Sequence, residues 1–189
     1  MKNFIIVLTF LVIGVNVNSQ ESNELSIGDE VSHFSAFDDQ GNVWKSSDLN
    51  SDFLVVYFYP AAMTGGCTKQ ACAYRDDKTS LDELGASVVA VSGDEVKNLK
   101  IFKESYQLNF PLLSDNEGNI SKLFGVPTNI GGSITREING ENFLLNRGIT
   151  APRWTFVLDK NRKIIYKNAE VNAEEDSNNV KKLIKEYSK

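Results

Sequence analysis

The chain has 189 residues, of which 41% are hydrophobic and 24% are charged, with 13 glycines and 4 prolines. This composition excludes collagen-like, low-complexity and disordered proteins, and the length suits one domain with a sizeable core. The formal net charge of −5 argues against a nucleic-acid partner. With two cysteines and one histidine, the chain forms neither a disulfide-rich scaffold nor a zinc site of four Cys and His ligands.

Residues 1–19 have the length and order of a secretory signal peptide. Lys2 gives a positive start, residues 4–15 are an almost unbroken apolar run, and small residues precede Gln20. A permanent membrane helix is the alternative, but a bilayer span needs about 20 apolar residues. We therefore expect residues 20–189 to be the mature domain, exported to the periplasm or secreted, with no stable membrane insertion after cleavage.

Strand and helix patterns alternate along residues 20–189. Residues 53–59 (FLVVYFY) are typical of a central strand buried on both faces, and Asn139-Gly140 in an insertion at 127–152 predicts a hairpin. Further strands are predicted at 34–37, 43–44, 87–92, 110–114, 154–158 and 163–166, and helices at 64–84, 96–106, 120–124 and 173–187. This order predicts an α/β fold of the thioredoxin-like kind, with a mixed central sheet flanked by helices.

Residues that suit catalysis gather where the 53–59 strand gives way to the next helix. Cys67 falls in the first turn of that helix, where free backbone N–H groups and the positive end of the helix dipole favour a thiolate. Thr64 is a plausible N-cap and can direct its hydroxyl toward the sulfur or a bound oxygen. Gly65 and Gly66 permit close approach of the backbone.

The two cysteines are five residues apart. On one ideal helix their Cα atoms would be about 8.6 Å apart, whereas a disulfide needs about 4.4–6.8 Å. We therefore expect Cys67 and Cys72 to bond only where the helix unwinds locally, as in a redox switch. A permanent structural disulfide and a metal-binding pair are the alternatives, and the geometry and the distant single histidine favour neither.

The spacing Pro60-x-x-x-Thr64-x-x-Cys67 resembles the PxxxTxxC active-site motif of peroxiredoxins. The longer segment YFYPAAMTGGCTKQACAYRD resembles the bacterioferritin-comigratory-protein (PrxQ-type) branch of the AhpC/TSA family. The arginine that this family places before a late strand corresponds to Arg153 in PRWTFVLD. The resemblance extends from about Gly28 to the last predicted helix.

This resemblance implies a thiol peroxidase that reduces hydrogen peroxide and organic hydroperoxides. Cys67 would attack the peroxide, Arg153 would hold the thiolate and polarise the O–O bond, and Thr64 would position the peroxide oxygens. Pro60 would shield the thiolate from water. Cys72 would then form a disulfide with Cys67, which a thioredoxin-like dithiol partner would reduce. The branch further implies a monomer that needs no metal, flavin or haem.

Other interpretations remain open at this point. Gly65 and Gln70 stand where the family commonly has Pro and Glu, and by spacing alone Arg153 could be a surface charge. An exported thiol–disulfide oxidoreductase acting on proteins would normally carry Cys-x-x-Cys, which this chain lacks. A copper-delivery module would need a histidine well placed beside the cysteines, and His33 is a poor candidate.

Overall fold

The computed structural model describes residues 25–189, so the predicted signal peptide lies outside the described residues. The helices are α1 Gly65–Glu83, α2 Val96–Tyr106, α3 Asn119–Leu123 and α4 Asp176–Tyr187, with a short 3-10 helix at Ser46–Asp48. The strands are β1 Ser35–Asp38, β2 Val43–Lys45, β3 Phe53–Phe58, β4 Ala86–Ser92, β5 Leu112–Ser114, β6 Asn129–Ile138, β7 Glu141–Thr150, β8 Trp154–Asp159 and β9 Ile164–Asn168.

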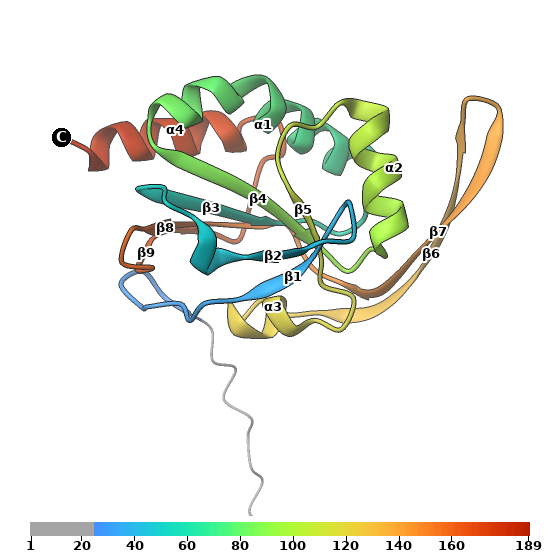
Figure 1. Ribbon diagram of the computed structural model, residues 1–189, viewed down its shortest axis with the longest axis horizontal. Coiled ribbons are helices and arrows are strands. Elements are labelled where there is room, and N and C mark those ends of the chain that lie inside the picture. The colour runs from blue at the N-terminus through green and yellow to red at the C-terminus, as the bar shows by residue number, and fades with distance from the viewer. Residues whose placement is uncertain (1–24) are drawn as a thin grey trace, which may run out of the picture.

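Seven of these strands form a mixed sheet in the order β2-β1-β5-β4-β3-β8-β9 (Figure 1). β4 pairs in parallel with both β3 and β5, and the remaining neighbours are antiparallel. Helices α1, α2 and α4 lie on one side of the sheet and α3 on the other (Figure 1). The mixed α/β fold predicted from the sequence is therefore confirmed.

β3 is buried on both faces, as its continuous apolar run predicts. The alternate side chains Phe53, Val55 and Tyr57 join the core that includes residues of α1, α2 and α4. Their neighbours Leu54, Val56 and Phe58 join the core on the other face, which includes residues of α3. Because side chains on a strand alternate between faces, only an unbroken apolar run can fill both cores. β3 is thereby a fixed support for the loop that follows it.

Several boundaries differ from the predicted ones for local reasons. Strand β5 begins at Leu112 and not at residue 110, because Pro111 has no N–H to give to a strand ladder. The last helix begins at Asp176 and not at residue 173. Its predicted first turn is held in a separate turn, in which the Asn172 side chain accepts from the Glu174 N–H at 3.1 Å.

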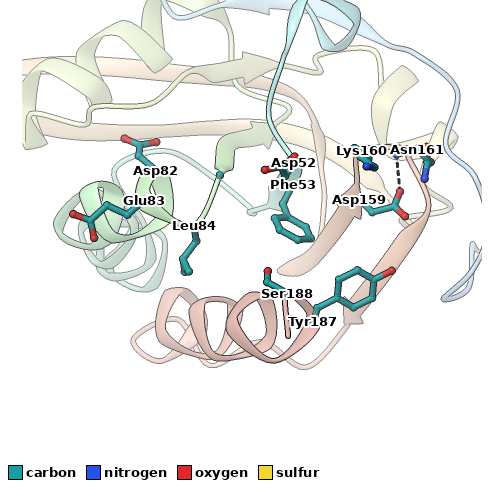
Figure 2. Close-up of a pocket in the computed structure, with 11 residues that line it drawn as sticks. Asp52, Phe53, Asp82, Glu83, Leu84, Asp159, Lys160, Asn161, Tyr187 and Ser188 are labelled. Carbon is teal, nitrogen blue, oxygen red and sulfur yellow. Dashed lines mark hydrogen bonds between the residues drawn. The ribbon is translucent and has the colours of Figure 1, made fainter.

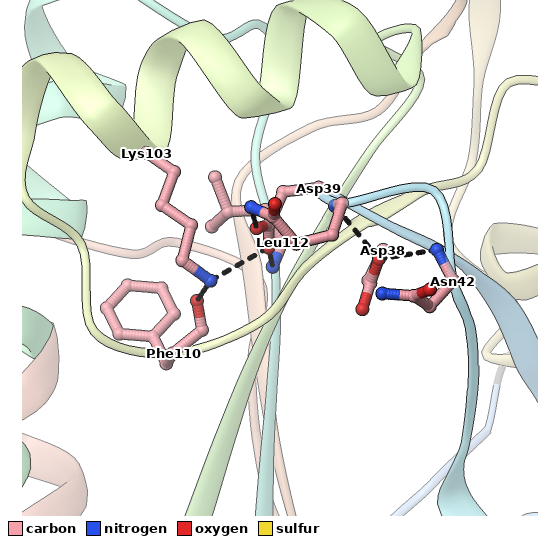
Figure 3. Close-up of polar contacts among 7 residues, drawn as sticks. Asp38, Asp39, Asn42, Lys103, Phe110 and Leu112 are labelled. Atoms are coloured by element: carbon pink, nitrogen blue, oxygen red, sulfur yellow. Dashed lines mark hydrogen bonds and ion pairs between the residues drawn. The ribbon is translucent and has the colours of Figure 1, made fainter.

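The β1–β2 hairpin pairs with β5 and is also attached to the body through a buried carboxylate, that of Asp39 (Figure 3). Asp39 Oδ1 accepts hydrogen bonds from Lys103 Nζ on α2 and from the Leu112 N–H on β5, each at 3.0 Å. Lys103 also donates to the Phe110 carbonyl at 3.1 Å. Pairing and hydrogen bonding together offset the cost of burying the Asp39 charge, so this contact fixes the edge of the sheet.

β6 and β7 form a separate two-stranded hairpin, residues 129–150, which we call the arm. Its turn is Asn139-Gly140 as predicted, with φ of 54° and 85°, the positive values that a two-residue hairpin turn of this type requires. The arm extends away from the body (Figure 1). None of the helices in the described part of the chain is long and apolar enough to span a bilayer.

Candidate active site

Cys67 lies in the first turn of α1, directly beyond the end of β3. Its side chain is buried, with 2% of the residue exposed. Cys72 lies further along the same helix and is half-buried, and both thiols are free. The helix is continuous between them, so the expected arrangement of two separated cysteines on one helix is what the structure has.

Arg153 reaches this sulfur from the residue position just before β8. β8 pairs antiparallel with β3, and the register that places Trp154 opposite Phe58 brings the preceding arginine to the end of β3. Arg153 Nη2 donates to Cys67 Sγ at 3.3 Å. The sequence correspondence is therefore matched in space, and Arg153 is not an isolated surface charge.

The two glycines before Cys67 have different roles. A Cβ on Gly66 would lie 3.1 Å from Arg153 Nη2, so the small residue leaves room for the guanidinium. A Cβ on Gly65 would meet nothing within 4 Å. The prediction of a close approach is thus confirmed for Gly66 and wrong for Gly65, where the backbone faces open space.

A chain of hydrogen bonds continues from Arg153 into the protein. Arg153 Nη1 donates to Gln70 Oε1 at 2.6 Å, and Gln70 Nε2 donates to Asp176 Oδ2 at 2.8 Å. Tyr74 and Thr155 donate their hydroxyls to the same oxygen of Asp176, each at 2.8 Å. Helix α1 meets β8 and α4 here, although both follow it at a long distance in the sequence, because α1 and α4 pack side by side over the sheet (Figure 1).

Asp176 is a buried carboxylate in the first turn of α4. Burial raises its pKa, and the hydrogen bonds from Thr155, Gln70 and Tyr74 together with the charge of Arg153 act in the opposite direction. No motif surrounds Asp176 in the sequence, so this residue was not predicted as part of the site. Gln70 was noted in the sequence as a departure from the family's common Glu, and because it follows Cys67 by three residues it shares the helix face of the cysteine.

Thr64 occupies the N-cap position of α1 with extended backbone angles, but its side chain makes no capping bond. Its hydroxyl instead donates to the Ala61 carbonyl at 2.9 Å. The expected cap is therefore wrong for the side chain, because the loop carbonyl takes the hydroxyl proton. The lone pairs of the hydroxyl oxygen remain available as acceptors.

Pro60 follows the end of β3 and is half-buried. It lines a pocket of about 290 Å³ together with Pro127, Ala151 and Pro152. This pocket adjoins the residue before Arg153, although neither Cys67 nor Arg153 lines it. The wall beside the site is thus largely apolar.

The loop between β3 and α1 is held from two directions. Asp94, buried after β4, accepts from the Ala62 N–H at 2.8 Å and from the Ser92 hydroxyl at 2.8 Å. Arg136 of the arm donates to the Met63 carbonyl at 2.9 Å. Met63 has a φ of 61°, a left-handed conformation uncommon for a side-chain-bearing residue, so these bonds hold a strained loop.

Two stacked tyrosines belong to the same buried core cluster as Cys67. The rings of Tyr57 and Tyr74 lie 4.7 Å apart and almost parallel. Burial raises the pKa of Tyr57 well above its ordinary value, and the neighbouring Cys67 and Asp176 add to the effect. Burial likewise raises the pKa of Tyr74. Both phenol groups therefore stay neutral. Buried, uncharged rings give a low local dielectric, which strengthens the interaction between Arg153 and the sulfur.

A second pocket, of about 760 Å³, lies at the opposite end of β3 (Figure 2). Its lining includes the acidic side chains of Asp52, Asp82, Glu83 and Asp159, and contains neither cysteine. Within residues 25–189, no group of three or more His, Cys, Asp or Glu side chains is arranged to hold a metal ion. Cys67 and Arg153 lie at the other end of β3 and do not line this pocket.

Comparison with known proteins places this geometry in a family. Residues 27–167 match the model of the AhpC/TSA family. A chloroplastic peroxiredoxin Q of Oryza sativa subsp. japonica is 37% identical over 143 residues, which cover 76% of this chain and 58% of that protein. The chain thus spans less than two thirds of the length of this relative.

Solved structures agree with that match. The peroxidoxin BcpB of Mycobacterium tuberculosis has a TM-score of 0.72 and 32% identity, and the alignment covers 86% of this chain and 98% of that one. The PrxQ C47S mutant of Xylella fastidiosa has a TM-score of 0.73 over 88% and 99% of the two chains, and at 22% identity it supports the fold. On these grounds the chain belongs to the AhpC/TSA family, with the thioredoxin-like fold of peroxiredoxins of the PrxQ and bacterioferritin-comigratory-protein type.

Proposed function

We propose that the protein is a thiol peroxidase that reduces hydrogen peroxide and organic hydroperoxides through Cys67. The observation that carries the proposal is the guanidinium of Arg153, which donates to the buried Cys67 sulfur at 3.3 Å beside the N-terminus of α1. Two positive features thus converge on one sulfur, and both favour the thiolate, the form that reacts with peroxides. Membership of the AhpC/TSA family supports the same reaction.

In the first step the Cys67 thiolate attacks the terminal oxygen of the peroxide. An S–O bond forms as the O–O bond breaks, so the sulfur is oxidised to a sulfenic acid. The remaining oxygen leaves as water or an alcohol after it takes up a proton. Arg153 has a planar fork of N–H donors and is suited to stabilise the charge that moves onto the leaving oxygen.

Thr64 and Pro60 complete the proposed site. The lone pairs of the Thr64 hydroxyl can accept from the peroxide O–H, because its own proton is directed to the Ala61 carbonyl. Pro60 has no N–H and, half-buried at the end of β3, would exclude water from the thiolate. Both residues follow the motif on which the family resemblance rests.

Cys72 would resolve the sulfenic acid. Its thiolate attacks the Cys67 sulfur, a disulfide forms and water leaves. Since two Cα atoms five residues apart on an intact helix are about 8.6 Å from each other, the first turns of α1 must unwind for the sulfurs to meet. Arg75 is a nearby cation: its pKa is raised, chiefly by a hydrogen bond to Asp76 and to a smaller extent by the charge of Cys72. A thioredoxin-like dithiol would then reduce the disulfide by exchange.

The reaction is tested with the reduced protein mixed with hydrogen peroxide, following peroxide loss and the oxidation state of sulfur together. We expect fast loss that disappears in Cys67→Ser, a Cys67–Cys72 disulfide in the parent, and a sulfenic acid trapped in Cys72→Ser. A rate no greater than that of free cysteine contradicts the proposal. Exchange with protein disulfides in the absence of peroxide would then favour the oxidoreductase alternative.

We further propose that residues 1–19 are removed on export and that the mature protein acts outside the cytoplasm as a monomer. The support for export is the charge and apolar pattern of the N-terminus, and the support for a monomer is the branch that the chain resembles. N-terminal sequencing of the protein recovered from cell fractions checks the first point, with Gln20 as the expected first residue. Light scattering during gel filtration checks the second.

A further inference from the structure

One cluster of buried polar groups near the site has no place in the steps above. It is the sequence of contacts from Arg153 through Gln70 to Asp176, with hydrogen bonds of 2.6 Å and 2.8 Å. Both Gln70 and Asp176 are fully buried, with 0% and 1% of each residue exposed. Buried polar groups of this kind are costly unless their hydrogen bonds are made, so the order of donors and acceptors is informative.

The two hydrogen-bond partners of Gln70, Arg153 and Asp176, determine which way its amide oxygen and nitrogen face. A guanidinium has only donors, so Arg153 requires the amide oxygen. Asp176 Oδ2 accepts from three donors at once, so it requires the amide nitrogen. Arg153 and Asp176 therefore require the same orientation of the Gln70 amide. A rotation of the amide by half a turn would place N–H groups against N–H groups at Arg153.

We propose that Asp176 is a positioning residue for the peroxidase reaction, acting through the Gln70 amide to keep an oxygen acceptor facing Arg153. The inference rests on the proposed function, since it concerns the same arginine and cysteine. With the neutral amide between them, the carboxylate holds the guanidinium in place without contacting it directly. The other Nη of Arg153 is thus directed to the Cys67 sulfur, and its charge is not neutralised by an adjacent carboxylate.

The proposal predicts that one carboxylate and one amide are required at these two positions. In Gln70→Glu, two carboxylates meet where the amide N–H was, and like charges at that distance repel. In Asp176→Asn, position 176 can present either its amide oxygen or its NH2 group to Gln70, so it no longer fixes which way the Gln70 amide faces and the amide nitrogen can turn toward Arg153. In the double variant Gln70→Glu/Asp176→Asn, the carboxylate at position 70 accepts from Arg153 and the amide at position 176 donates to that carboxylate. An acceptor again faces Arg153 and a donor–acceptor pair again joins positions 70 and 176, with the carboxylate and the amide exchanged between the two positions.

The readout is the rate at which iodoacetamide alkylates Cys67. All variants are made in the full chain with Cys72→Ser, which leaves Cys67 as the only thiol because the chain has two cysteines. At pH 6 we expect each single variant to react about tenfold more slowly than its parent, the effect of losing one favourable charge interaction on a thiol. At pH 9, where ordinary cysteines already ionise, the difference should largely vanish. The double variant should return at pH 6 to within about threefold of the parent, because one aligned acceptor again faces Arg153.

Ser177→Ala is the matched control. Ser177 is the residue next to Asp176, and its hydroxyl donates to Asp77 Oδ2 at 2.7 Å, so this variant removes a different hydrogen bond between α4 and α1. We expect it to react at the parental rate at pH 6. Circular dichroism and a thermal melt of every variant show whether α4 is still docked.

Three results would overturn the inference. Single variants that are folded and react at pH 6 as fast as the parent show that the amide orientation does not matter. A double variant no faster than the slower single variant shows that the exchanged pattern does not restore the arrangement. An equal loss in Ser177→Ala shows that the effect is general docking of α4. Since alkylation needs no peroxide, these outcomes are distinct from a failure of the proposed peroxidase activity.

Discussion

Arg153 has two partners at once, and this double contact decides what can replace it. One Nη meets the Cys67 sulfur while the other meets Gln70, which only a planar fork of donors can do. Lysine carries the same charge on a single flexible amine, so it can serve one partner but not hold both in this geometry. Charge alone is thus insufficient at position 153.

Arg153→Lys should lower the rate of peroxide consumption by about 100-fold, the typical effect of losing one aligned donor at a reacting centre. Stopped-flow measurement of the first oxidation step checks this. The thermal midpoint serves as the control and should be nearly unchanged, because Arg153 is only half-buried. A rate close to that of the parent would mean that the positive charge is sufficient without the fork.

Replacing Gly65 should stabilise the protein. It is the first residue of α1, where an N–H has no intrahelical acceptor, and a Cβ there meets nothing within 4 Å. Thr64 before it has φ −103° and ψ 150°, the extended conformation that a following proline requires. Gly65→Pro should therefore raise the free energy of unfolding by about 0.5–1 kcal/mol, mainly by restricting the unfolded chain.

Urea unfolding checks the Gly65→Pro gain, with Gly66→Ala as the comparison. At Gly66 the added methyl carbon would lie 3.1 Å from Arg153 Nη2, so this change should displace the guanidinium and slow the reaction with peroxide. No gain from proline at position 65 would indicate that the loop before α1 needs glycine for a reason other than space.

At the scale of the element, the arm is fixed to the body at its root. The Gly93 carbonyl accepts from the Gly148 N–H at 3.0 Å, and the Asn146 carbonyl accepts from the Glu95 N–H at 3.1 Å. Further out, Arg136 contacts the Met63 carbonyl in the loop before Cys67. The arm thus braces the loop before the reactive cysteine, in addition to extending from the body.

Gly93→Ala should damage the root of the arm. The new Cβ would lie 2.1 Å from the Ile149 carbonyl oxygen, and a clash with backbone cannot be relieved by a side-chain rotation. We expect a loss of about 1–3 kcal/mol in the free energy of unfolding, the usual cost of overpacking. Chemical denaturation measures it.

Gly132→Ala is the matched control within the arm, because its Cβ meets nothing closer than 3.8 Å. Its stability should stay within about 0.5 kcal/mol of the parent, as for most surface changes. Equal effects at the two glycines would argue that the arm is sensitive to alanine anywhere, and not through contact at its root.

Most helices and strands could be predicted from the sequence, because each is specified by residues that are close together in the chain. The buried run of β3, the amphipathic helix α2 and the Asn139-Gly140 turn of the arm each depend on neighbouring residues. Cys67 and Arg153 were found through a motif of short range and its downstream partner. Asp176 could not be found in this way, because its role arises only when α4 packs on α1 and brings Gln70 to it across 106 positions of sequence.

At the scale of the molecule, three buried carboxyls affect how stability depends on pH. Burial raises the pKa values of Asp94, Asp115 and Asp176, and in each case hydrogen bonds to the carboxyl act in the opposite direction without cancelling the effect. A carboxyl with a raised pKa binds protons more readily in the folded state than in the unfolded chain. Its contribution to stability is fully present below its ordinary pKa and is lost as pH rises through the raised value.

Asp94→Asn removes one of these titrations at nearly constant shape. Relative to the parent, the free energy of unfolding of the variant should therefore improve steadily as pH rises from about 4 to about 7. Urea unfolding of both proteins at several pH values in that range checks the trend. A difference between parent and variant that is independent of pH, or that moves in the opposite direction, would show that burial does not dominate at Asp94.

The contact between α1 and α4 has a consequence for how the chain folds. The cysteine belongs to the first helix and the carboxylate behind its arginine belongs to the last, so the hydrogen bond between Gln70 and Asp176 closes a loop of 106 positions. Contacts between residues so distant in the chain tend to form late, since the entropy of loop closure must be met first. Rapid alkylation of Cys67 at mildly acidic pH should consequently appear only in the final phase of refolding. The alkylation rate of this thiol would then report when α4 docks on α1.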